Sequence, residues 1–413
     1  MMNQTWGTVI LSGGSGRRMG YTDKSGLICE GKTFLEVIGE QLTALGHPCY
    51  LSRAAYKGGN HEKGFTVIED AVQGGNGEWI GPMGGIWSCF QRTSEDCLFF
   101  VSCDMPLFRD VMVKRLLAHR KPGVDAVLWR TRDGRIQPMC ALYSRTCTDS
   151  LKQCIDTHNY RMMGFLEHLN YVIIEASAEH IPDSWFLNVN TPEVYRRLMG
   201  RKQPVLAVSG RKNTGKTWLL EMLVEQLSAA GIRAAVIKHD GHEFEADVPG
   251  TDSYRMKKAG AIGTVVYSSS QFSLVKDRPG LEAEDFLKCF PEADVILLEG
   301  QKYSSYPKIE VLRHVVSSEP VCCPETVLAY VSDGPVVQES QPEPAGTGCL
   351  VPAPTGIGCP VPIPTGTGCP VPIPTGTGCP GLRPVLSFEN RDEITELVIC
   401  FIDRQAQHPD KEY

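Results

Sequence analysis

Short apolar runs alternate with helical patterns over roughly the first half of the chain. A closing helix with Pro192 in its first turn is predicted within residues 190–204. Alternating strands and helices are typical of a parallel-rich sheet wrapped by helices, so a first α/β domain is predicted over residues 1–200. The runs that predict its strands are TVIL (8–11), FTVIED (65–70), CLFFVSCD (97–104), DAVLWR (125–130) and YVIIEA (171–176).

A second alternating pattern begins after Pro204 and predicts an independent α/β domain over residues 203–341. Its helix, TWLLEMLVEQLSAAG (217–231), carries leucines at helical spacing and ends at Gly231. The predicted strands of this domain are VLAV (205–208), AAVIKH (234–239), GTVVYS (263–268) and ADVILLEG (293–300).

Residues 342–381 form a ten-residue repeat rich in proline and glycine, with a cysteine in each copy. Apart from Glu343 the segment has no charged or aromatic residue, and this composition favours a disordered insertion of polyproline character. The alternative, a weak metal or redox role for the four cysteines, is disfavoured because structural zinc sites pair cysteines two to four residues apart. A strand and an amphipathic helix are predicted after the repeat, so residues 382–413 are expected to complete the second domain.

Composition narrows the class of protein. A length of 413 residues exceeds what one core supports, which agrees with two domains. The formal charge of −7 comes without a basic stripe, and no apolar run reaches the length of a membrane helix, so neither nucleic acid nor a membrane is expected as a partner. The N-terminus lacks the pattern of an export signal. The 16 cysteines are spread along the chain, which favours a reducing, cytoplasmic setting.

The first glycine-rich loop, SGGSGRRMG (12–20), follows a predicted strand. Open α/β sheets bind ligands at the carboxyl ends of their strands, and glycines let backbone N–H groups approach a polyphosphate. Arg17, Arg18 and Lys24 add the positive charge that a triphosphate needs.

Two carboxylates follow predicted strands of the same domain. Asp70 ends the run at 65–70, and Asp104 ends the run at 97–104, so both are expected at the edge that carries the loop. Carboxylate oxygens suit Mg²⁺, with nucleotide phosphates completing its shell. The alternatives are that Asp104 caps the next helix and that Asp70 pairs with a surface base.

The second loop, GRKNTGKT (210–217), matches the G-x-x-x-x-G-K-[ST] pattern between a predicted strand and a predicted helix. Its backbone N–H groups are expected to hold phosphates, Lys216 to reach the β and γ phosphates, and Thr217 to bind Mg²⁺. Glu299 is a further candidate for that Mg²⁺ shell or an ordinary strand-end acid. His239 and His242 are a metal pair or, by preference, residues of a polar turn. The predicted nucleotide-binding positions are Gly210, Asn213, Thr214, Gly215, Lys216 and Thr217.

The first domain resembles the molybdenum cofactor guanylyltransferases. The segments VILSGGSGRRMGYTDKSGL, VIEDAV, GPMGGI, SCDMPL and NVNTPEV occur in that family's order and cover nearly all of residues 1–195. The resemblance implies a Rossmann-like nucleotidyltransferase fold that transfers GMP from Mg·GTP to molybdopterin and releases pyrophosphate. This sequence departs from the family's pattern at Ser12 and in LSRAAY (51–56), which leaves base contacts near Arg53 in doubt.

The same resemblance assigns roles by position. It places Lys24 at the GTP phosphates and Asp104 at Mg²⁺, and with Arg18, chosen for the charge of the loop, these are the expected catalytic residues. The residues expected to bind nucleotide or cofactor are Leu11, Ser12, Gly13, Gly14, Lys24, Asp70, Asn188 and Asn190. The metal ligands expected over the whole chain are Asp104, Thr217 and Glu299.

The second domain resembles the molybdopterin-guanine dinucleotide biosynthesis adapter proteins over residues 203–313, on the phosphate loop and the segments at 237–261 and 297–311. The resemblance implies a P-loop NTPase-like fold that binds GTP. A molybdenum-insertion protein and molybdoenzyme apoproteins or their chaperones are expected as partners. The sequence leaves the oligomeric state open, with a homodimer through this domain as one option. The sequence leaves two other functions open: transfer of CMP or action on a sugar phosphate, and a non-catalytic GTP-binding delivery scaffold.

Overall fold

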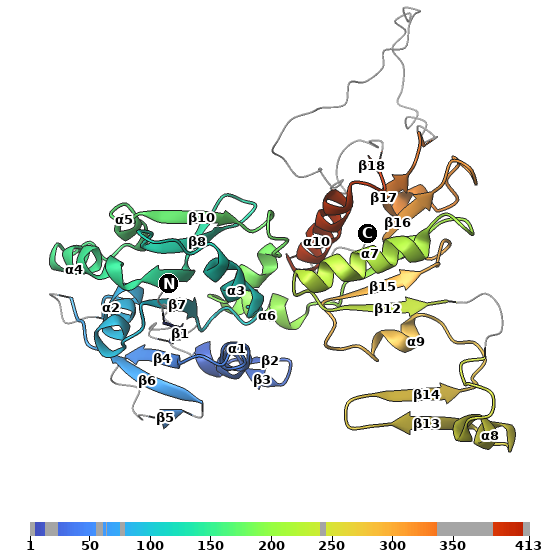
Figure 1. Cartoon of the computed structure of the whole chain (residues 1–413), viewed down its shortest axis with the longest axis horizontal. Helices are drawn as coiled ribbons and strands as arrows, with labels where there is room; N and C mark the ends of the chain where they lie inside the picture. Colours follow the sequence, from blue (N-terminus) through green and yellow to red (C-terminus); the bar gives the residue numbers. More distant parts are fainter. Residues whose placement is uncertain are drawn as a thin grey trace, which may run out of the picture. The chain divides into compact units, whose positions relative to one another are not determined.

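The structure is a computed structural model, and it describes residues 5–12, 24–54, 61–62, 64–74, 79–239, 245–336 and 383–407. The chain divides into two compact units (Figure 1). The first comprises Met1–Lys202 with Gln226–Ile232 and Asp392–Glu412, and the second comprises Gln203–Glu225 and Arg233–Arg391. The ten-residue repeat, and Gly13, Gly14, Arg18 and His242 among the predicted site residues, lie outside the described residues.

An eight-stranded sheet organises the first unit, with strand order β10-β8-β9-β7-β1-β4-β6-β5. β7, β1, β4 and β6 are parallel neighbours, and β9 runs antiparallel to both β7 and β8. The predicted parallel-rich α/β sheet is therefore confirmed. The strands are β1 (Trp6–Leu11), β4 (Cys49–Ala54), β5 (His61–Glu62), β6 (Phe65–Asp70), β7 (Cys97–Ser102), β8 (Ala126–Arg130), β9 (Ile136–Ser144) and β10 (Tyr171–Glu175).

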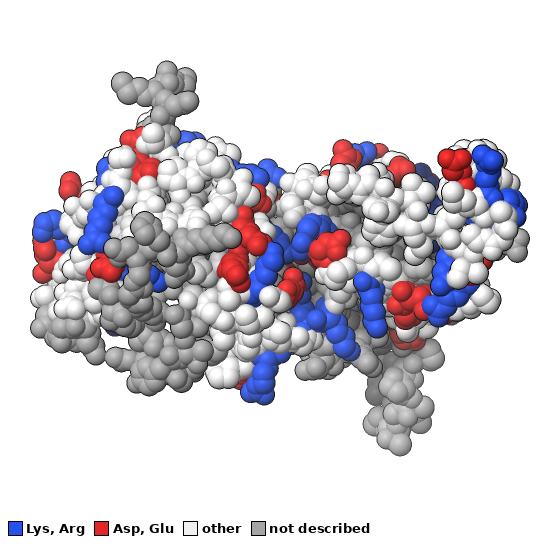
Figure 2. Space-filling model, turned by 90° about the horizontal axis from the view of Figure 1, so that it is seen from below, with Lys and Arg blue, Asp and Glu red and all other residues white. Residues whose placement is uncertain are grey.

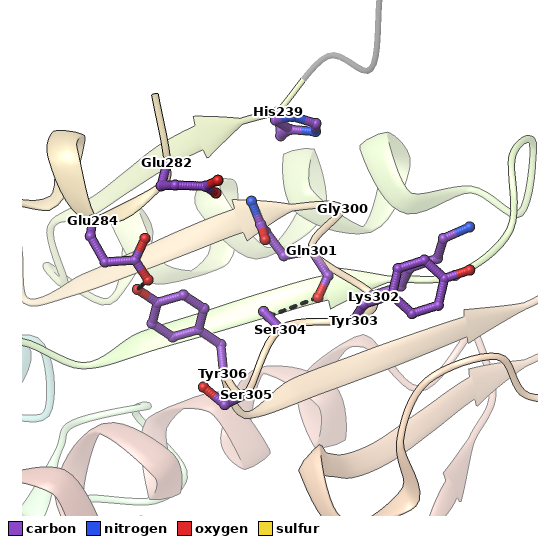
Figure 3. Close-up of a pocket in the computed structure, with 11 residues that line it drawn as sticks. His239, Glu282, Glu284, Gly300, Gln301, Lys302, Tyr303, Ser304, Ser305 and Tyr306 are labelled. Atoms are coloured by element: carbon purple, nitrogen blue, oxygen red, sulfur yellow. Dashed lines mark hydrogen bonds between the residues drawn. The ribbon is translucent and has the colours of Figure 1, made fainter. Parts of the chain in front are cut away.

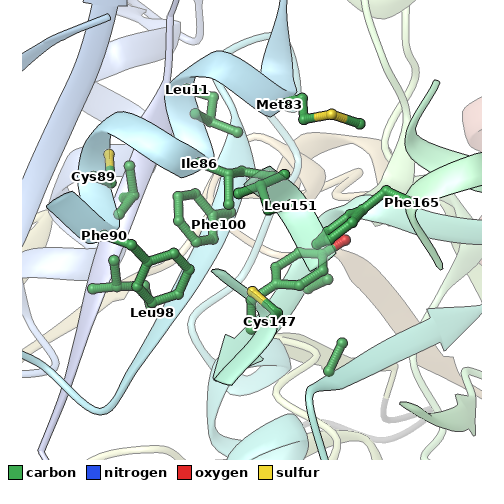
Figure 4. Packing of buried hydrophobic residues seen from close by; sticks show 14 of the residues in the cluster. Leu11, Met83, Ile86, Cys89, Phe90, Leu98, Phe100, Cys147, Leu151 and Phe165 are labelled. Atoms are coloured by element: carbon green, nitrogen blue, oxygen red, sulfur yellow. The ribbon is translucent and has the colours of Figure 1, made fainter. Parts of the chain in front are cut away.

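Helices pack on this sheet through apolar faces. α2 contributes Ile86 and Phe90, which lie with Phe100 of β7 and Phe165 of α5 in one buried cluster (Figure 4). The predicted closing helix is present as α6, with Pro192 at its first position and Thr191 as its N-cap. The helices are α1 (Phe34–Thr43), α2 (Pro82–Arg92), α3 (Val111–Ala118), α4 (Thr148–Asp156), α5 (Met162–Leu166) and α6 (Pro192–Met199). A short hairpin of β2 (Ile28–Cys29) and β3 (Lys32–Thr33) precedes α1.

The second unit contains a six-stranded, wholly parallel sheet with order β12-β15-β11-β16-β17-β18. The predicted strand at 263–268 exists as β13, but it pairs antiparallel with β14 in a separate two-stranded ribbon. The elements that follow residue 204 in the sequence are β11 (Val205–Ser209), α7 (Lys216–Ala229), β12 (Ala234–Lys238), α8 (Asp252–Lys258), β13 (Gly263–Tyr267), β14 (Phe272–Lys276), α9 (Glu284–Leu287), β15 (Val295–Glu299), β16 (Lys308–Leu312), β17 (Val327–Ser332), β18 (Val385–Leu386) and α10 (Arg391–Gln407).

The segment after the repeat forms the expected strand and helix. β18 pairs with β17 in the second unit's sheet, whereas Asp392–Glu412, which holds most of α10, groups with the first unit. The assignment of residues 382–413 to the second domain stays a prediction.

The described surface and cysteines bear on the compositional expectations. On the face drawn in Figure 2, acidic and basic side chains are interspersed over the described residues, without a continuous basic patch. The described cysteines are thiols with no disulfide among them. Within the described part of the chain, no helix combines the length and the apolar character needed to cross a bilayer.

Candidate functional site

The strand register of the first unit brings the predicted site residues to one edge. Leu11 at the end of β1 is level with Ser52 of β4 and with Ser102 of β7. Ser52 is in turn level with Ile68, two residues before Asp70 on β6. Because these strands are parallel, the ends of all four lie at the carboxyl edge of the sheet, where α/β folds bind ligands.

Asp70 lies in a tight cluster at this edge. The Ser52 hydroxyl donates a hydrogen bond of 2.9 Å to Asp70 Oδ1, and the carboxylate is buried. Burial raises the pKa of Asp70, and the bond from Ser52 partly opposes that rise. A Cβ on Gly85 of α2 would lie 2.8 Å from both Leu11 Cδ2 and Ser52 Oγ, so only glycine lets this helix approach the cluster so closely.

Lys24, Asp104 and Asn190 meet in a second cluster. The Lys24 ammonium donates to Asp104 Oδ2 at 2.9 Å and also to Asn190 Oδ1. Ser102 Oγ donates to Asp104 Oδ1 at 2.6 Å, and the backbone N–H of Val189 donates to the Asp104 carbonyl. The structure therefore brings together a lysine, a carboxylate and an amide that lie far apart in the sequence.

These contacts speak against one of the two sequence interpretations of Asp104, the helix cap, and Asp110 is the residue that precedes α3 as its N-cap. The role of Asp104 as a Mg²⁺ ligand stays a prediction. Its carboxylate contacts Lys24 and Ser102, and its side chain is 9% exposed, so it is not a helix cap. Asp70 accepts a hydrogen bond from Ser52. Ser52 and Ser102 were not among the predicted site residues. Their positions in the sequence could have indicated them, because each lies within two residues of the carboxyl end of its strand.

The remaining predicted residues of this edge differ in their contacts. Leu11 and Ser12 are buried, and the backbone N–H of Ser12 donates to the Ser52 carbonyl at 2.7 Å. Asn188 does not join the Lys24 cluster through its amide nitrogen, which donates to the Phe186 carbonyl at 2.9 Å.

The donors at this edge of the sheet suit a Mg²⁺ ion that takes few ligands from the protein. The described residues contain no group of three or more His, Cys, Asp or Glu side chains that could hold a metal ion. Mg²⁺ commonly takes only one or two protein carboxylates and completes its octahedron with phosphate oxygens and water. A single carboxylate at the ligand-binding edge, here Asp104, fits that mode of binding.

In the second unit, residues 210–217 link β11 to α7 and form the phosphate loop. Gly210 has a φ of 137° and Gly215 a φ of 98°, and Asn213 also adopts a left-handed conformation. A Cβ on Gly210 would lie 2.4 Å from the Val311 carbonyl oxygen, so this position requires glycine. The predicted strand–loop–helix context of the motif is confirmed.

Side chains of the phosphate loop are held by the loop and by β15. Lys216 Nζ donates to the Arg211 carbonyl at 2.7 Å, and the buried Thr214 hydroxyl donates to the same oxygen at 3.0 Å. Burial lowers the pKa of Lys216. Thr217 Oγ1 donates to Glu299 Oε1 at 3.1 Å, so the structure brings together the two residues predicted to share a Mg²⁺ shell. One hydroxyl and one carboxylate again fit an ion that takes its other ligands from phosphates.

Comparisons with known proteins match the two halves separately. The family model described as the MobA-like NTP transferase domain matches residues 8–172. The family model described as molybdopterin guanine dinucleotide synthesis protein B, or MobB, matches residues 205–333.

Individual relatives divide in the same way. The molybdopterin-guanine dinucleotide biosynthesis adapter protein of Escherichia coli (strain K12) is 38% identical over 140 residues, which are 32% of this chain and 80% of that protein. The probable molybdenum cofactor guanylyltransferase of Bacillus licheniformis is 31% identical over 44% of this chain and 90% of its own length. The molybdenum cofactor guanylyltransferase of Shewanella halifaxensis is 31% identical over 46% of this chain and 92% of its own length. The chain therefore belongs to both families, as a MobA-like NTP transferase domain followed by a MobB domain.

Proposed function

We propose that the first unit transfers GMP from GTP to molybdopterin, and that the second unit is a fused adapter that binds GTP. The products are molybdopterin-guanine dinucleotide and pyrophosphate. The names of the relatives support this function. The observation that carries it is the cluster of Lys24, Asp104 and Asn190 at the carboxyl edge of a nucleotidyltransferase-like sheet.

This reaction requires neutralisation of the negative charge on the phosphates and does not require a nucleophile from the protein. A terminal phosphate oxygen of molybdopterin attacks the α-phosphorus of GTP, and the bond from that phosphorus to the β-phosphate oxygen breaks as pyrophosphate leaves. Catalysis of such a step consists of in-line positioning and stabilisation of negative charge. Lys24 supplies a positive charge to the phosphates, together with Arg18, and Asn190 holds the Lys24 ammonium from the other side.

Asp104 is the proposed Mg²⁺ ligand of this site. A bound Mg²⁺ would neutralise the phosphates and orient them. Ser102 fixes one carboxylate oxygen of Asp104, and Lys24 takes the other. Leu11, Ser12, Gly13, Gly14 and Asp70 are the proposed nucleotide contacts, and Asn188 is placed on the molybdopterin side.

The choice of nucleotide and acceptor has a direct test. The purified chain is incubated with Mg²⁺, molybdopterin and GTP, CTP or ATP in separate reactions, and the dinucleotide is identified by mass. We expect the guanine dinucleotide with one pyrophosphate per product. Preferential formation of the cytosine dinucleotide, or turnover only with a sugar phosphate, would contradict the guanylyl assignment.

In the adapter unit, we propose that the phosphate loop holds GTP. Lys216 contacts the β and γ phosphates, and Thr217 with Glu299 binds the accompanying Mg²⁺. The Thr217–Glu299 hydrogen bond supports this pairing.

Fusion keeps the adapter at a high effective concentration near the transferase, because the two share one chain. We further propose a cytoplasmic location, and a molybdenum-insertion protein and molybdoenzyme apoproteins or their chaperones as partners.

The β13–β14 ribbon supports the proposed homodimer through the adapter unit. Val265 pairs with Leu274 and Tyr267 with Phe272, so these four share one face of the ribbon, and each is more than half exposed. A two-stranded ribbon is marginally stable alone, and a self-complementary apolar face suits a two-fold dimer. We expect light scattering to give twice the chain mass, and Val265→Asp with Leu274→Asp to give the single-chain mass. A monomeric wild type would contradict the dimer.

A further inference from the structure

A pocket of about 680 Å³ lies at the carboxyl edge of β11 and β15, beside the phosphate loop (Figure 3). It is bordered by Gly210, the first residue of that loop, and by Gly300, which follows Glu299. Glu299 contacts Thr217, so Gly300 places one border of the pocket next to the proposed Mg²⁺ ligands in the sequence. The nucleotide functions assigned above do not use the remaining lining residues.

The floor of the pocket is a rigid loop, residues 300–306. The fully buried Lys308 of β16 donates its Nζ protons to the carbonyl oxygens of Gln301, Lys302 and Ser304, at 3.2, 3.4 and 2.7 Å. Burial lowers the pKa of this lysine. Taking an ammonium group out of water costs several kcal/mol unless it is well bonded, so these three bonds fix the loop in one shape.

Gln301 adds to this order and faces the ligand space. Its φ is 56°, a left-handed conformation that is uncommon for glutamine. The Ser304 hydroxyl donates to the Gln301 carbonyl at 2.8 Å, which ties the turn together. Figure 3 shows the Gln301 side chain directed toward Glu282. A shaped, pre-organised floor is what a specific binding site requires.

The wall of the pocket is acidic and aromatic. Tyr306 donates its hydroxyl to Glu284 Oε1 at 2.5 Å, which joins the wall to the floor. Glu284 keeps a second oxygen for ligand donors, and Glu282 accepts no side-chain hydrogen bond from the described residues. His239 and Tyr306 also line the pocket, and each provides a flat ring surface (Figure 3).

These groups favour a flat ring that presents adjacent N–H donors. A carboxylate accepts two parallel hydrogen bonds from a ring N–H and its neighbouring amino group, as it does from a guanidinium. The 2-amino-4-oxopyrimidine ring has that donor pair, aromatic side chains can stack on it, and an amide such as Gln301 can pair with its carbonyl.

We propose that this pocket binds a 2-amino-4-oxopyrimidine-fused ring, the ring that pterins and guanine share, with Glu282 and Glu284 as the acceptors. The inference rests on the proposed function, which supplies both kinds of ring. A pterin held here would lie beside the phosphates of GTP in the adapter unit.

The test is direct binding to the full chain, without turnover. 6-Hydroxymethylpterin is titrated by its fluorescence, and a GTP analogue with a methylene bridge between the α and β phosphates is titrated by calorimetry. Wild type is compared with Glu282→Gln, Glu284→Gln and the control Glu292→Gln, an exposed acid of the same unit. Loss of one charge-assisted pair is expected to weaken one phase of pterin binding about tenfold or more.

The outcomes distinguish a pterin from a guanine base as the ligand of the pocket. They also distinguish failure of this inference from failure of the proposed GMP transfer. Weaker pterin binding with unchanged analogue binding assigns the pocket to a pterin, and the reverse assigns it to the guanine base; both support the ring chemistry. Unchanged binding of both ligands in the Glu282 and Glu284 variants, with the fold intact by circular dichroism, overturns the inference. GMP transfer is measured in parallel, and its absence from wild type would contradict only the proposed function.

Discussion

Replacing Asp104 by Asn is expected to lower the rate of GMP transfer by at least about 100-fold, the usual cost of removing one electrostatic contact to developing charge. The Asp104 carboxylate is the one charged acceptor that contacts Lys24 at the carboxyl edge among the described residues. Asn keeps the size and the bond from Ser102, but it loses the charge that a Mg²⁺ ligand needs. The measurement is pyrophosphate release in the presence of GTP, Mg²⁺ and molybdopterin.

The control for this variant is Asp156→Asn. Asp156 pairs with Lys152 on the exposed surface of α4, and both side chains are more than half exposed, so its loss should change neither stability nor rate measurably. GTP binding by the adapter unit should survive both substitutions. Transfer at the wild-type rate by folded Asp104→Asn would remove Asp104 from the Mg²⁺ site. It would also favour the alternative in which the first unit only holds the cofactor.

Replacing Lys216 by Ala is expected to weaken GTP binding in the adapter unit about 10- to 100-fold, because a charge-assisted contact contributes about 1.5–3 kcal/mol. Lys216 lies at the start of α7, and its ammonium bonds only to the Arg211 carbonyl among the described residues, a contact that phosphates can replace. The expected readout is loss of one phase in a calorimetric titration with the α,β-methylene analogue of GTP.

Basal GMP transfer should persist in Lys216→Ala, because the transfer residues belong to the other unit. Lys288→Ala is the matched control, since it removes one exposed positive charge from the same unit. Complete loss of transfer in a folded Lys216→Ala protein would mean that the two nucleotide sites do not act separately.

The positions of the acidic residues at the strand ends could be predicted from the sequence, because they depend only on the neighbouring residues along the chain. The run before Asp104 is almost wholly apolar, and the run before Asp70 carries Phe65, Val67 and Ile68, so both strands and the shared edge follow from them. The phosphate loop was predictable for the same reason, since its glycines, lysine and threonine are contiguous.

Other strands escaped prediction because charged or irregular residues interrupt their patterns. β16 reads KIEVL, yet both Lys308 and Glu310 are fully buried. Lys308 is satisfied by loop carbonyls, and Glu310 accepts the backbone N–H of Val321 at 2.6 Å. Charged residues are usually exposed, so the sequence around Lys308 and Glu310 predicts surface positions for both. The backbone groups that bond to them come from other segments, and a local sequence pattern does not include those segments.

The side-chain partners of the site were beyond sequence pattern for a related reason. Lys24 contacts Asp104 and Asn190 across 80 and 166 residues of sequence. Glycine has a low helix propensity, and at Gly85 it allows the close approach of α2 to Leu11 and Ser52. Contacts of this kind follow from the packing of whole elements, not from the spacing of residues.

The central claim is that one chain carries two GTP sites. GTP is cleaved for GMP transfer in the first unit, and it is bound by the phosphate loop in the adapter unit. Equilibrium dialysis of the full chain with the α,β-methylene analogue of GTP, which resists the cleavage that transfer requires, measures the number of sites directly. The account predicts two analogue molecules per chain in wild type and one in Lys216→Ala, with GMP transfer from GTP retained in that variant. One molecule per chain in wild type, or two in folded Lys216→Ala at the same analogue concentration, would contradict it.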